Sequence, residues 1–314
     1  MLIANPIYDV VFKYLMEDAK IAKLLISSII QQEVKSLRFM PQEFVGDFEP
    51  QKGKKKPSSH KQRLGLTVYR IDFSAKIKTP EGEKQVIIEL QKAKFHTDIM
   101  RFRKYLGNQL ANKENTKRVR INGKTRKVAL PIISIYILGH RLDHTEASAI
   151  KVSRQYTDMI TGEIITQKEV FIESLTLDSH IIQIPYLTDK RRTELEILLR
   201  VFDQSTAIDT EHHILNMDEK DFPTKFRPVI RKLQQAVESQ EIKQQMNLED
   251  GIIDELEDLE REIEELEEKA AKADEAAAKA EEATIKAEEA TAKAEEEIEK
   301  LKKQIVDLLK NAKE

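Results

Sequence analysis

The chain has 314 residues, of which 40% are hydrophobic, and it contains no cysteine. This content is sufficient for one or two buried cores, and the lack of cysteine excludes disulfide bonds and thiolate metal sites. The first residues lack the basic and apolar stretches of a signal peptide, and the longest apolar run, residues 128–138, is too short to span a bilayer. We therefore expect a cytoplasmic protein without a membrane partner.

Charge is distributed unevenly along the chain. The formal net charge is −3, but residues 251–314 carry 22 acids and 11 bases, whereas residues 1–250 carry 41 bases and 33 acids. A basic body favours a polyanionic partner because binding releases counterions, although many basic domains bind no nucleic acid. The charge pattern is therefore weak evidence for nucleic-acid binding.

The first part of the chain predicts the order helix, strand, hairpin, helix, strand. Asn5 and Pro6 are typical of a helix start, and the apolar spacing after them predicts a helix to about residue 31. Periodicity then predicts a strand at 34–45 and a hairpin at about 66–91. An amphipathic helix is expected at 96–113, with Ile99, Phe102, Leu106 and Leu110 on one face, and a buried strand at 128–138. The predicted fold class is α/β.

Two basic stretches, 52–63 and 117–127, separate these elements and are expected to be loops. Residues 150–186 add strand-like runs, and residues 189–245 are mostly helical in pattern. We expect three regions: a core at 1–140, a β and helical extension packed on it at 141–249, and a coiled coil at 250–314.

The hairpin is predicted to place two acids opposite each other. The sequence Thr79-Pro80-Glu81-Gly82 has Pro and Gly where a type I turn prefers them, which pairs Thr79 with Gly82. Continued outward, this register pairs Asp72 with Glu89, and Arg70 with Gln91. Opposed like charges destabilise a strand pair, so a divalent cation with oxygen ligands is a natural partner for the two acids.

The same spacing has a simpler interpretation. The opposite face of the hairpin is a clean core face, so Asp72, Glu89 and Gln91 would lie on the solvated side, where acids are common. Arg70 would also neutralise the pair without any metal. Spacing alone leaves both interpretations open.

Three segments resemble the PD-(D/E)XK nuclease superfamily, specifically the bacterial PD-(D/E)XK nuclease family transposases, which are related to recombination-promoting nucleases. These segments are NPIYDVVFK at 5–13, YRIDF at 69–73 and VIIELQ at 86–91. The resemblance implies a restriction-endonuclease-like core, which is a helix-flanked mixed sheet. It also implies hydrolysis of phosphodiester bonds in double-stranded DNA that depends on Mg²⁺, with Mn²⁺ as an alternative ion.

Residue roles follow from this resemblance. Asp72 and Glu89 match the metal-binding acids, and Asp9 matches an acid on the first helix that completes the metal shell, although a first-turn acid paired with Lys13 explains Asp9 equally well. Gln91 stands where the superfamily most often has Lys, and its amide can orient water but supplies no charge to the developing phosphorane. Contacts to the DNA backbone are expected from Arg101, Tyr105, Lys54, Lys55, Lys56, Arg118 and Arg120.

The C-terminal region has a heptad pattern. From residue 252 onward, apolar or small residues recur at alternating spacings of four and three, without proline or glycine. The pattern predicts a coiled coil that would form a homodimer and pair two active sites, one for each DNA strand. The near-repeats at 279–283 and 286–290 also fit a single solvated helix that acts as a spacer.

Two functions are consistent with these features. The first is a Mg²⁺-dependent DNA endonuclease that acts in recombination, element mobility or defence. The second is a catalytically inactive relative, a DNA-binding or scaffolding protein that oligomerises through its coiled coil.

Overall fold

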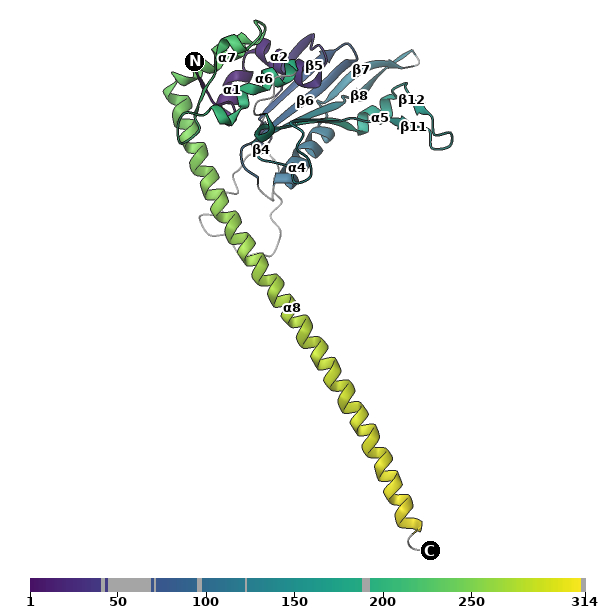
Figure 1. Cartoon of the computed structure of the whole chain (residues 1–314). Helices are drawn as coiled ribbons and strands as arrows, with labels where there is room; N and C mark the ends of the chain where they lie inside the picture. Colours follow the sequence, from purple (N-terminus) through teal and green to yellow (C-terminus); the bar gives the residue numbers. More distant parts are fainter. Residues whose placement is uncertain are drawn as a thin grey trace. The chain divides into compact units, whose positions relative to one another are not determined.

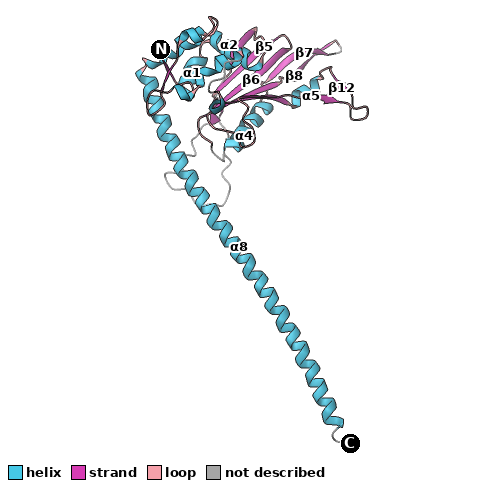
Figure 2. Ribbon diagram, viewed as in Figure 1, coloured by secondary structure: helices cyan, strands magenta, loops and turns pink. Residues whose placement is uncertain are grey.

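The computed structural model describes most of the chain as two compact units, residues 1–253 and 254–314. The described residues are 1–40, 43–44, 69–70, 72–94, 98–121, 123–187 and 193–311. All described strands belong to the first unit, and the second unit is helical (Figures 1 and 2).

The first unit contains a mixed six-stranded sheet with the order β10-β13-β9-β6-β5-β2. Its strands are β10 (Ala149–Val152), β13 (Leu177–Gln183), β9 (Ile132–Leu138), β6 (Gly82–Gln91), β5 (Phe73–Thr79) and β2 (Ser36–Phe39). The neighbours β6, β9 and β13 run parallel, and the remaining pairs are antiparallel. The α/β class and the mixed sheet are confirmed. Residues expected in the extension supply β10 and β13, so they share this sheet.

Helices cover both faces of the sheet (Figure 1). The larger core contains buried side chains of α1 (Asp9–Met16), α2 (Ala19–Ile30), α6 (Glu194–Leu199) and α7 (Arg227–Val237) together with inward residues of β5 and β6. On the other face lies α4 (Asp98–Ala111), where Tyr105 packs with Ile87 and Ile132 in a small second core. The strands β5 and β6 therefore have α1 and α2 packed on one face of the sheet and α4 on the other.

The N-terminal helix differs from its prediction. In place of one helix from Pro6 to about residue 31, there are two, and the first begins only at Asp9. The side chain of Asp18 accepts hydrogen bonds from the backbone N–H of Lys20 and Ile21 at 2.8 and 3.3 Å and caps the second helix. A new helix therefore starts after Asp18, because its carboxylate accepts the hydrogen bonds of N–H groups that would bond to backbone carbonyls in a continuous helix.

The basic stretch 117–127 is a ribbon and not the predicted loop. Strands β7 (Thr116–Ile121) and β8 (Lys124–Ala129) pair antiparallel around Gly123, whose φ of 75° suits glycine. The apolar run at 128–138 is consequently divided, since its first two residues end β8 and only its last seven residues form the buried strand β9.

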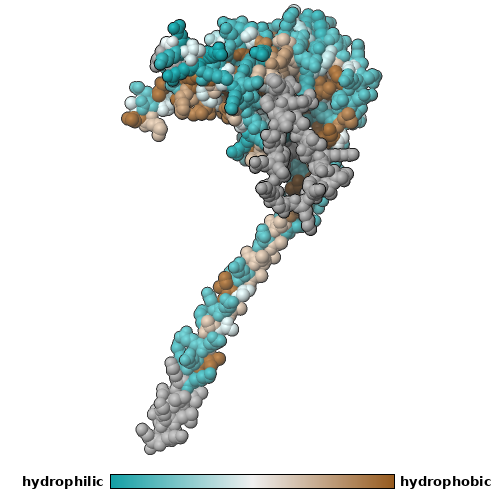
Figure 3. Space-filling model, turned by 180° about the vertical axis from the view of Figure 1, so that it is seen from behind, coloured by the Kyte–Doolittle hydropathy of each residue, from teal (hydrophilic) through white to brown (hydrophobic). Residues whose placement is uncertain are grey.

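The other described elements of the first unit are short. They are β1 (Leu2–Ala4), β3 (Glu43–Phe44), β4 (Tyr69–Arg70), β11 (Tyr156–Thr157), β12 (Ile164–Ile165), α5 (Val170–Leu175), β14 (Ile214–Asn216) and the 3₁₀ turns at 184–186, 200–202, 204–206 and 219–221. Because β4 pairs with β3, Arg70 lies opposite Glu43 and not opposite Gln91 as predicted. Figure 3 shows apolar residues, in brown, at the surface of the end that carries β11 and β12.

The second unit is the continuation of one helix, α8 (Gln240–Asn311). Ion pairs between residues four apart, such as Glu275 with Lys279 and Glu282 with Lys286, both at 2.6 Å, stabilise it. A long C-terminal helix is confirmed, and its assembly into a coiled coil stays a prediction. Among the described residues, no helix combines the length and apolar character needed to cross a membrane.

Candidate active site

Three predicted site acids come together from three elements. Asp9 is the first residue of α1, Asp72 immediately precedes β5, and Glu89 lies near the end of β6. In addition to desolvation, the negative charge of Asp9 raises the pKa of the nearby Asp72 carboxyl group, and the charge of Asp72 raises the pKa of Glu89 in turn. We call these residues the acid cluster.

The hairpin keeps its predicted register up to Phe73, which pairs with Ile88. Asp72 lies just beyond the last pair, and its Oδ2 accepts a hydrogen bond of 2.6 Å from the backbone N–H of Leu90. A carboxylate thus takes the place of a backbone acceptor at the end of the strand. This bond fixes Asp72 beside Glu89, although the two residues do not form a regular pair.

The hairpin face that carries Glu89 is buried and not solvated. Glu89 is only 5% exposed, and Gln91 is also buried. The helix α4 covers this face, and its Gln109 accepts a hydrogen bond of 2.8 Å from the Gln85 side chain. The interpretation of this face as a wet surface is therefore wrong for Glu89 and Gln91, whereas Asp72 is only partly buried. The buried Glu89 carboxylate needs a partner other than bulk water.

Burial favours the protonated forms of two acids in the cluster. Desolvation raises the pKa of Asp72 to about 8, with a further increase from the nearby Asp9 carboxylate and an opposing effect of the Leu90 N–H. Desolvation also raises the pKa of Glu89 well above its ordinary value, and repulsion by Asp72 adds to it while Arg101 opposes it. Such perturbed carboxyl groups gathered in one place are typical of functional sites.

The cluster contains carboxylate oxygens without hydrogen-bond partners. Asp9 Oδ1 and Glu89 Oε1 are both buried and unpaired. Leaving such atoms unsatisfied is costly, and a bound cation would remove the cost. Mg²⁺ is commonly held by one or two carboxylates with water and phosphate oxygens in the other positions, so this donor set fits Mg²⁺.

The acid cluster is not a preformed metal cage. Within the described ranges, no three or more His, Cys, Asp or Glu side chains are already arranged around one metal position. An ion would therefore draw on water and substrate oxygens for several of its ligands, which is the usual situation for Mg²⁺.

Two cations flank the cluster. Lys13, one turn after Asp9 on α1, forms an ion pair with it, and Lys13 also lowers the pKa of Asp72. Arg101 on α4 lowers the pKa of Glu89. The pair with Lys13 is the one that the simple helix explanation of Asp9 predicts, but Asp9 also lies beside Asp72. The ion pair with Lys13 is therefore confirmed, and the metal-binding role of Asp9 stays a prediction.

Gln91 ends β6 on the same side of the sheet as Glu89. Its position depends on a close approach of two chain segments, because the Gly139 N–H donates a hydrogen bond of 2.7 Å to the Gln91 carbonyl. A Cβ atom at Gly139 would lie 2.4 Å from the Lys92 carbonyl oxygen, so only glycine allows this approach. The predicted water-orienting residue is thus held beside the acids by the backbone.

The predicted DNA contacts lie in different environments. Tyr105 belongs to α4 and is buried between this helix and the sheet, and its contact with DNA stays a prediction. Arg118 and Arg120 are exposed on β7, and Arg101 is exposed on α4. Lys54, Lys55 and Lys56 lie outside the described residues.

Sequence reasoning missed a residue that touches the acid cluster. Both Oε atoms of Glu249 accept hydrogen bonds from the Asp9 backbone N–H, at 3.0 and 3.1 Å. They cap α1, because the N-cap residue Tyr8 provides no side-chain cap of its own. Burial raises the pKa of Glu249 to about 7. In the sequence, Glu249 is one acid among many near the start of the acidic helix, so no local signal distinguishes it.

The next residue, Asp250, also joins α8 to this region. It accepts a hydrogen bond of 2.9 Å from the Tyr8 hydroxyl, contacts His213 Nε2 at 2.6 Å and forms an ion pair with Lys92. The Lys92 ammonium lies 3.8 Å from the centre of the Tyr8 ring. The first turns of α8 are therefore part of the support for α1.

Comparisons with known proteins give no assignment. The chain matches no family model, and neither the curated proteins nor the solved structures include a significant match.

Proposed function

We propose that the protein is a Mg²⁺-dependent DNA endonuclease that hydrolyses phosphodiester bonds. The observation that supports this function most strongly is the acid cluster of Asp9, Asp72 and Glu89, in which two buried oxygens, Asp9 Oδ1 and Glu89 Oε1, have no hydrogen-bond partner. The mixed sheet and the positions of Asp72 and Glu89 on the hairpin agree with the resemblance to PD-(D/E)XK nucleases. A role in recombination, element mobility or defence belongs to the same proposal.

Each residue has a defined part in this mechanism. Asp72 and Glu89, with Asp9, would hold Mg²⁺ or Mn²⁺. When bound, the ion would polarise the scissile phosphate and lower the pKa of the attacking water. Gln91 orients that water through its amide. Because this amide is neutral, charge stabilisation from the protein falls to Arg101, which already attracts the Glu89 carboxylate.

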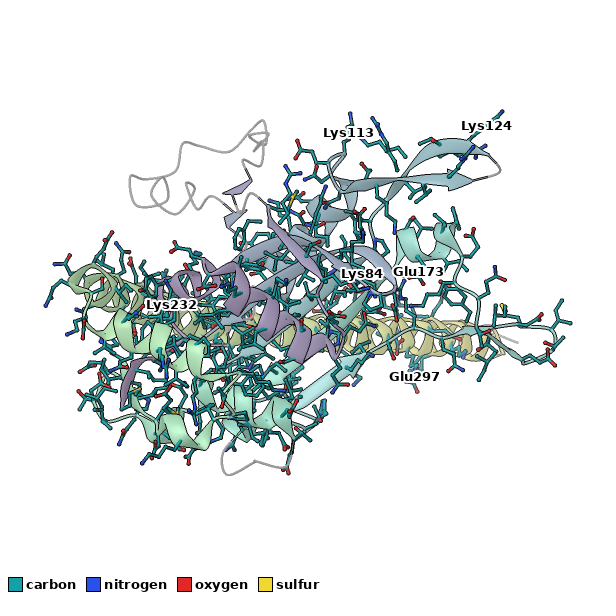
Figure 4. All side chains as sticks on the ribbon, turned by 90° about the horizontal axis from the view of Figure 1, so that it is seen from above. Lys84, Lys113, Lys124, Glu173, Lys232 and Glu297 are labelled. Carbon is teal, nitrogen blue, oxygen red and sulfur yellow. The ribbon has the colours of Figure 1, made fainter. Side chains whose placement is uncertain are left out.

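The β7–β8 ribbon is the proposed contact to the DNA backbone. It carries Lys117, Arg118, Arg120, Lys124, Arg126 and Lys127, and it contains no acid. Arg118 is paired directly with Lys127, a like-charge pair that a phosphate would offset. Figure 4 shows Lys113, just before the ribbon, and Lys124, at its tip, projecting away from the rest of the domain.

The variant Arg118→Ala/Arg120→Ala is expected to bind DNA more weakly and with a smaller salt dependence. Each lost phosphate contact should reduce the slope of log affinity against log salt by about one. Fluorescence anisotropy with labelled duplex at several salt concentrations measures this slope. The exposed residues Lys20 and Lys220 provide a control, because Lys20→Ala/Lys220→Ala removes the same charge outside the ribbon. An equal loss in both variants would contradict a specific role for the ribbon.

A homodimer formed through residues 250–314 is part of the proposal. The heptad pattern supports it, and three apolar residues at pattern positions, Leu266, Ile298 and Leu301, are more than half exposed in the single chain. Light scattering of the full chain is expected to give the mass of two chains, and Leu266→Lys/Leu301→Lys should halve it. A monomeric wild-type protein would favour the solvated spacer helix.

Cleavage of supercoiled plasmid tests the endonuclease directly. Nicked product that forms with Mg²⁺ and is absent with EDTA is the expected result. The second candidate function is a DNA-binding scaffold without activity, and the neutral Gln91 at a position where the superfamily most often has Lys favours it. Absence of cleavage in both Mg²⁺ and Mn²⁺, with salt-sensitive binding retained, would support the scaffold.

A further inference from the structure

A hollow of about 590 Å³ lies between α4 and the sheet. We call it the α4 hollow. Gln91 of β6 and Tyr136 of β9 contribute to one side of it, and Phe102 of α4 contributes to the other. Tyr136 is the strand neighbour of Glu89, and the Glu89 carboxylate raises the pKa of the Tyr136 hydroxyl in addition to the larger effect of burial. The hollow and the acids therefore share one end of the sheet.

The lining of the α4 hollow is mostly apolar and contains two aromatic rings. The rings of Phe102 and Tyr136 have centroids 5.4 Å apart and are tilted by 47°. Leu106 and Leu138 add aliphatic surface, and Ile99 stands at the edge with 68% of its surface exposed. Pockets of this size and composition are typical of sites for small, flat, weakly polar groups.

Polar groups in the wall of the α4 hollow are suited to a nucleotide. Lys94 and Arg103 bring positive charge to it, and Asp143, which also lines the hollow, offsets part of this charge through an ion pair of 2.8 Å with Lys94. His140 also lines the hollow, and its Nε2 is buried without a hydrogen-bond partner. The combination offers stacking surface to a base, a hydrogen-bonding atom to its edge, and cations to its phosphates.

We propose that the α4 hollow binds one unpaired nucleobase of the strand to be cut. This inference rests on the proposed nuclease function and adds a substrate preference to it. A base within a duplex is stacked on both sides and cannot enter a pocket between a helix and a sheet, so only an unpaired or extruded base fits. The protein would therefore prefer DNA with an unpaired nucleotide beside the scissile phosphate. The cations favour this occupant over an apolar peptide.

A fluorescent base tests the inference without cleavage. A single-stranded oligonucleotide that contains 2-aminopurine is titrated with the full-length protein in EDTA, and stacking on the aromatic rings should quench its fluorescence. Phe102→Ala is expected to weaken binding roughly tenfold and to remove most of the quenching. The control Phe171→Ala changes an aromatic residue on α5 that is 70% exposed and lies outside the hollow, so it should alter neither quantity.

A second variant keeps the inference testable if Phe102→Ala fails to fold. Ile99→Asp places a negative charge at an exposed position on the edge of the hollow, where folding should tolerate it, and it should weaken oligonucleotide binding. Unchanged affinity and quenching in both variants, or equal affinity for fully paired DNA, would overturn the inference. A change in oligomeric state with unchanged oligonucleotide binding would assign the hollow to a second copy of the chain and also overturn it.

The outcome is separable from the test of the nuclease. Quenching that depends on Phe102, in a protein that cuts no plasmid, would support the base-binding hollow and contradict only the nuclease. Metal-dependent nicking without quenching would contradict only the base-binding hollow.

Discussion

Glu89→Gln is expected to lower the rate of plasmid nicking by about a thousandfold while leaving DNA affinity nearly unchanged. The substitution keeps the size of the side chain but removes the charge that would bind the proposed metal ion. A metal ion contributes several kcal/mol of transition-state stabilisation, and each factor of ten in rate corresponds to about 1.4 kcal/mol. Initial rates at saturating Mg²⁺ and anisotropy with the same DNA measure the two quantities separately.

The matched control for this variant is Glu83→Gln. Glu83 lies on the same strand, and the chemical change is identical, but its side chain is exposed near the turn of the hairpin. Its nicking rate should stay within about twofold of wild type, since surface changes have small effects. A Glu89→Gln protein that nicks at the wild-type rate would contradict the proposed metal site.

Asp72→Asn is expected to stabilise the metal-free protein at alkaline pH and to abolish stabilisation by Mg²⁺. The pKa of Asp72 is raised from 3.8 to about 8, mainly by burial, so the folded state favours the protonated form. The stability that this proton contributes is present below the ordinary pKa and is lost as the pH rises through about 8. Asparagine cannot ionise, so the variant should be more stable near pH 9 by on the order of 2 kcal/mol, or roughly 4–8 °C.

Thermal denaturation in EDTA and in excess Mg²⁺, at several pH values between about 5 and 9, measures both effects. Wild type should gain stability with Mg²⁺ most strongly at the alkaline end, where Asp72 is ionised without metal. Asp274→Asn, which removes an exposed acid from α8, serves as the control and should behave as wild type. Equal Mg²⁺ effects in wild type and Asp72→Asn would show that the ion binds elsewhere.

The hairpin could be predicted from sequence because its determinants are local. The turn residues Thr79 to Gly82 set the register, and the alternation of apolar residues sets the core face, and both agree with the structure. The approach of Asp72 to Glu89 follows from the same register. The prediction that Asp9 lies with these two acids comes from the family resemblance alone. Nothing in the local sequence of Asp9 indicates that α1 packs against this end of the sheet.

Other features depend on contacts between distant segments. The predicted apolar face of α4 includes Leu110, but Leu110 is 41% exposed. Its neighbour Gln109 is buried instead, only 1% exposed, because Gln109 completes a polar network with Gln85 and Asn115. The cap that Glu249 provides to α1 joins segments from opposite ends of the first unit. Periodicity cannot reveal such polar pairs, because each partner by itself looks like a surface residue.

The central claim is that the acid cluster binds a divalent cation, and the anomalous scattering of crystals soaked in Mn²⁺ tests it most directly. The expected result is a single strong peak within coordination distance of the Asp72 and Glu89 carboxylates, which disappears in Glu89→Gln. A peak at another site would contradict the claim. The absence of any peak beside Asp72 and Glu89, with the two carboxyl groups bonded to each other through a shared proton, would contradict it as well.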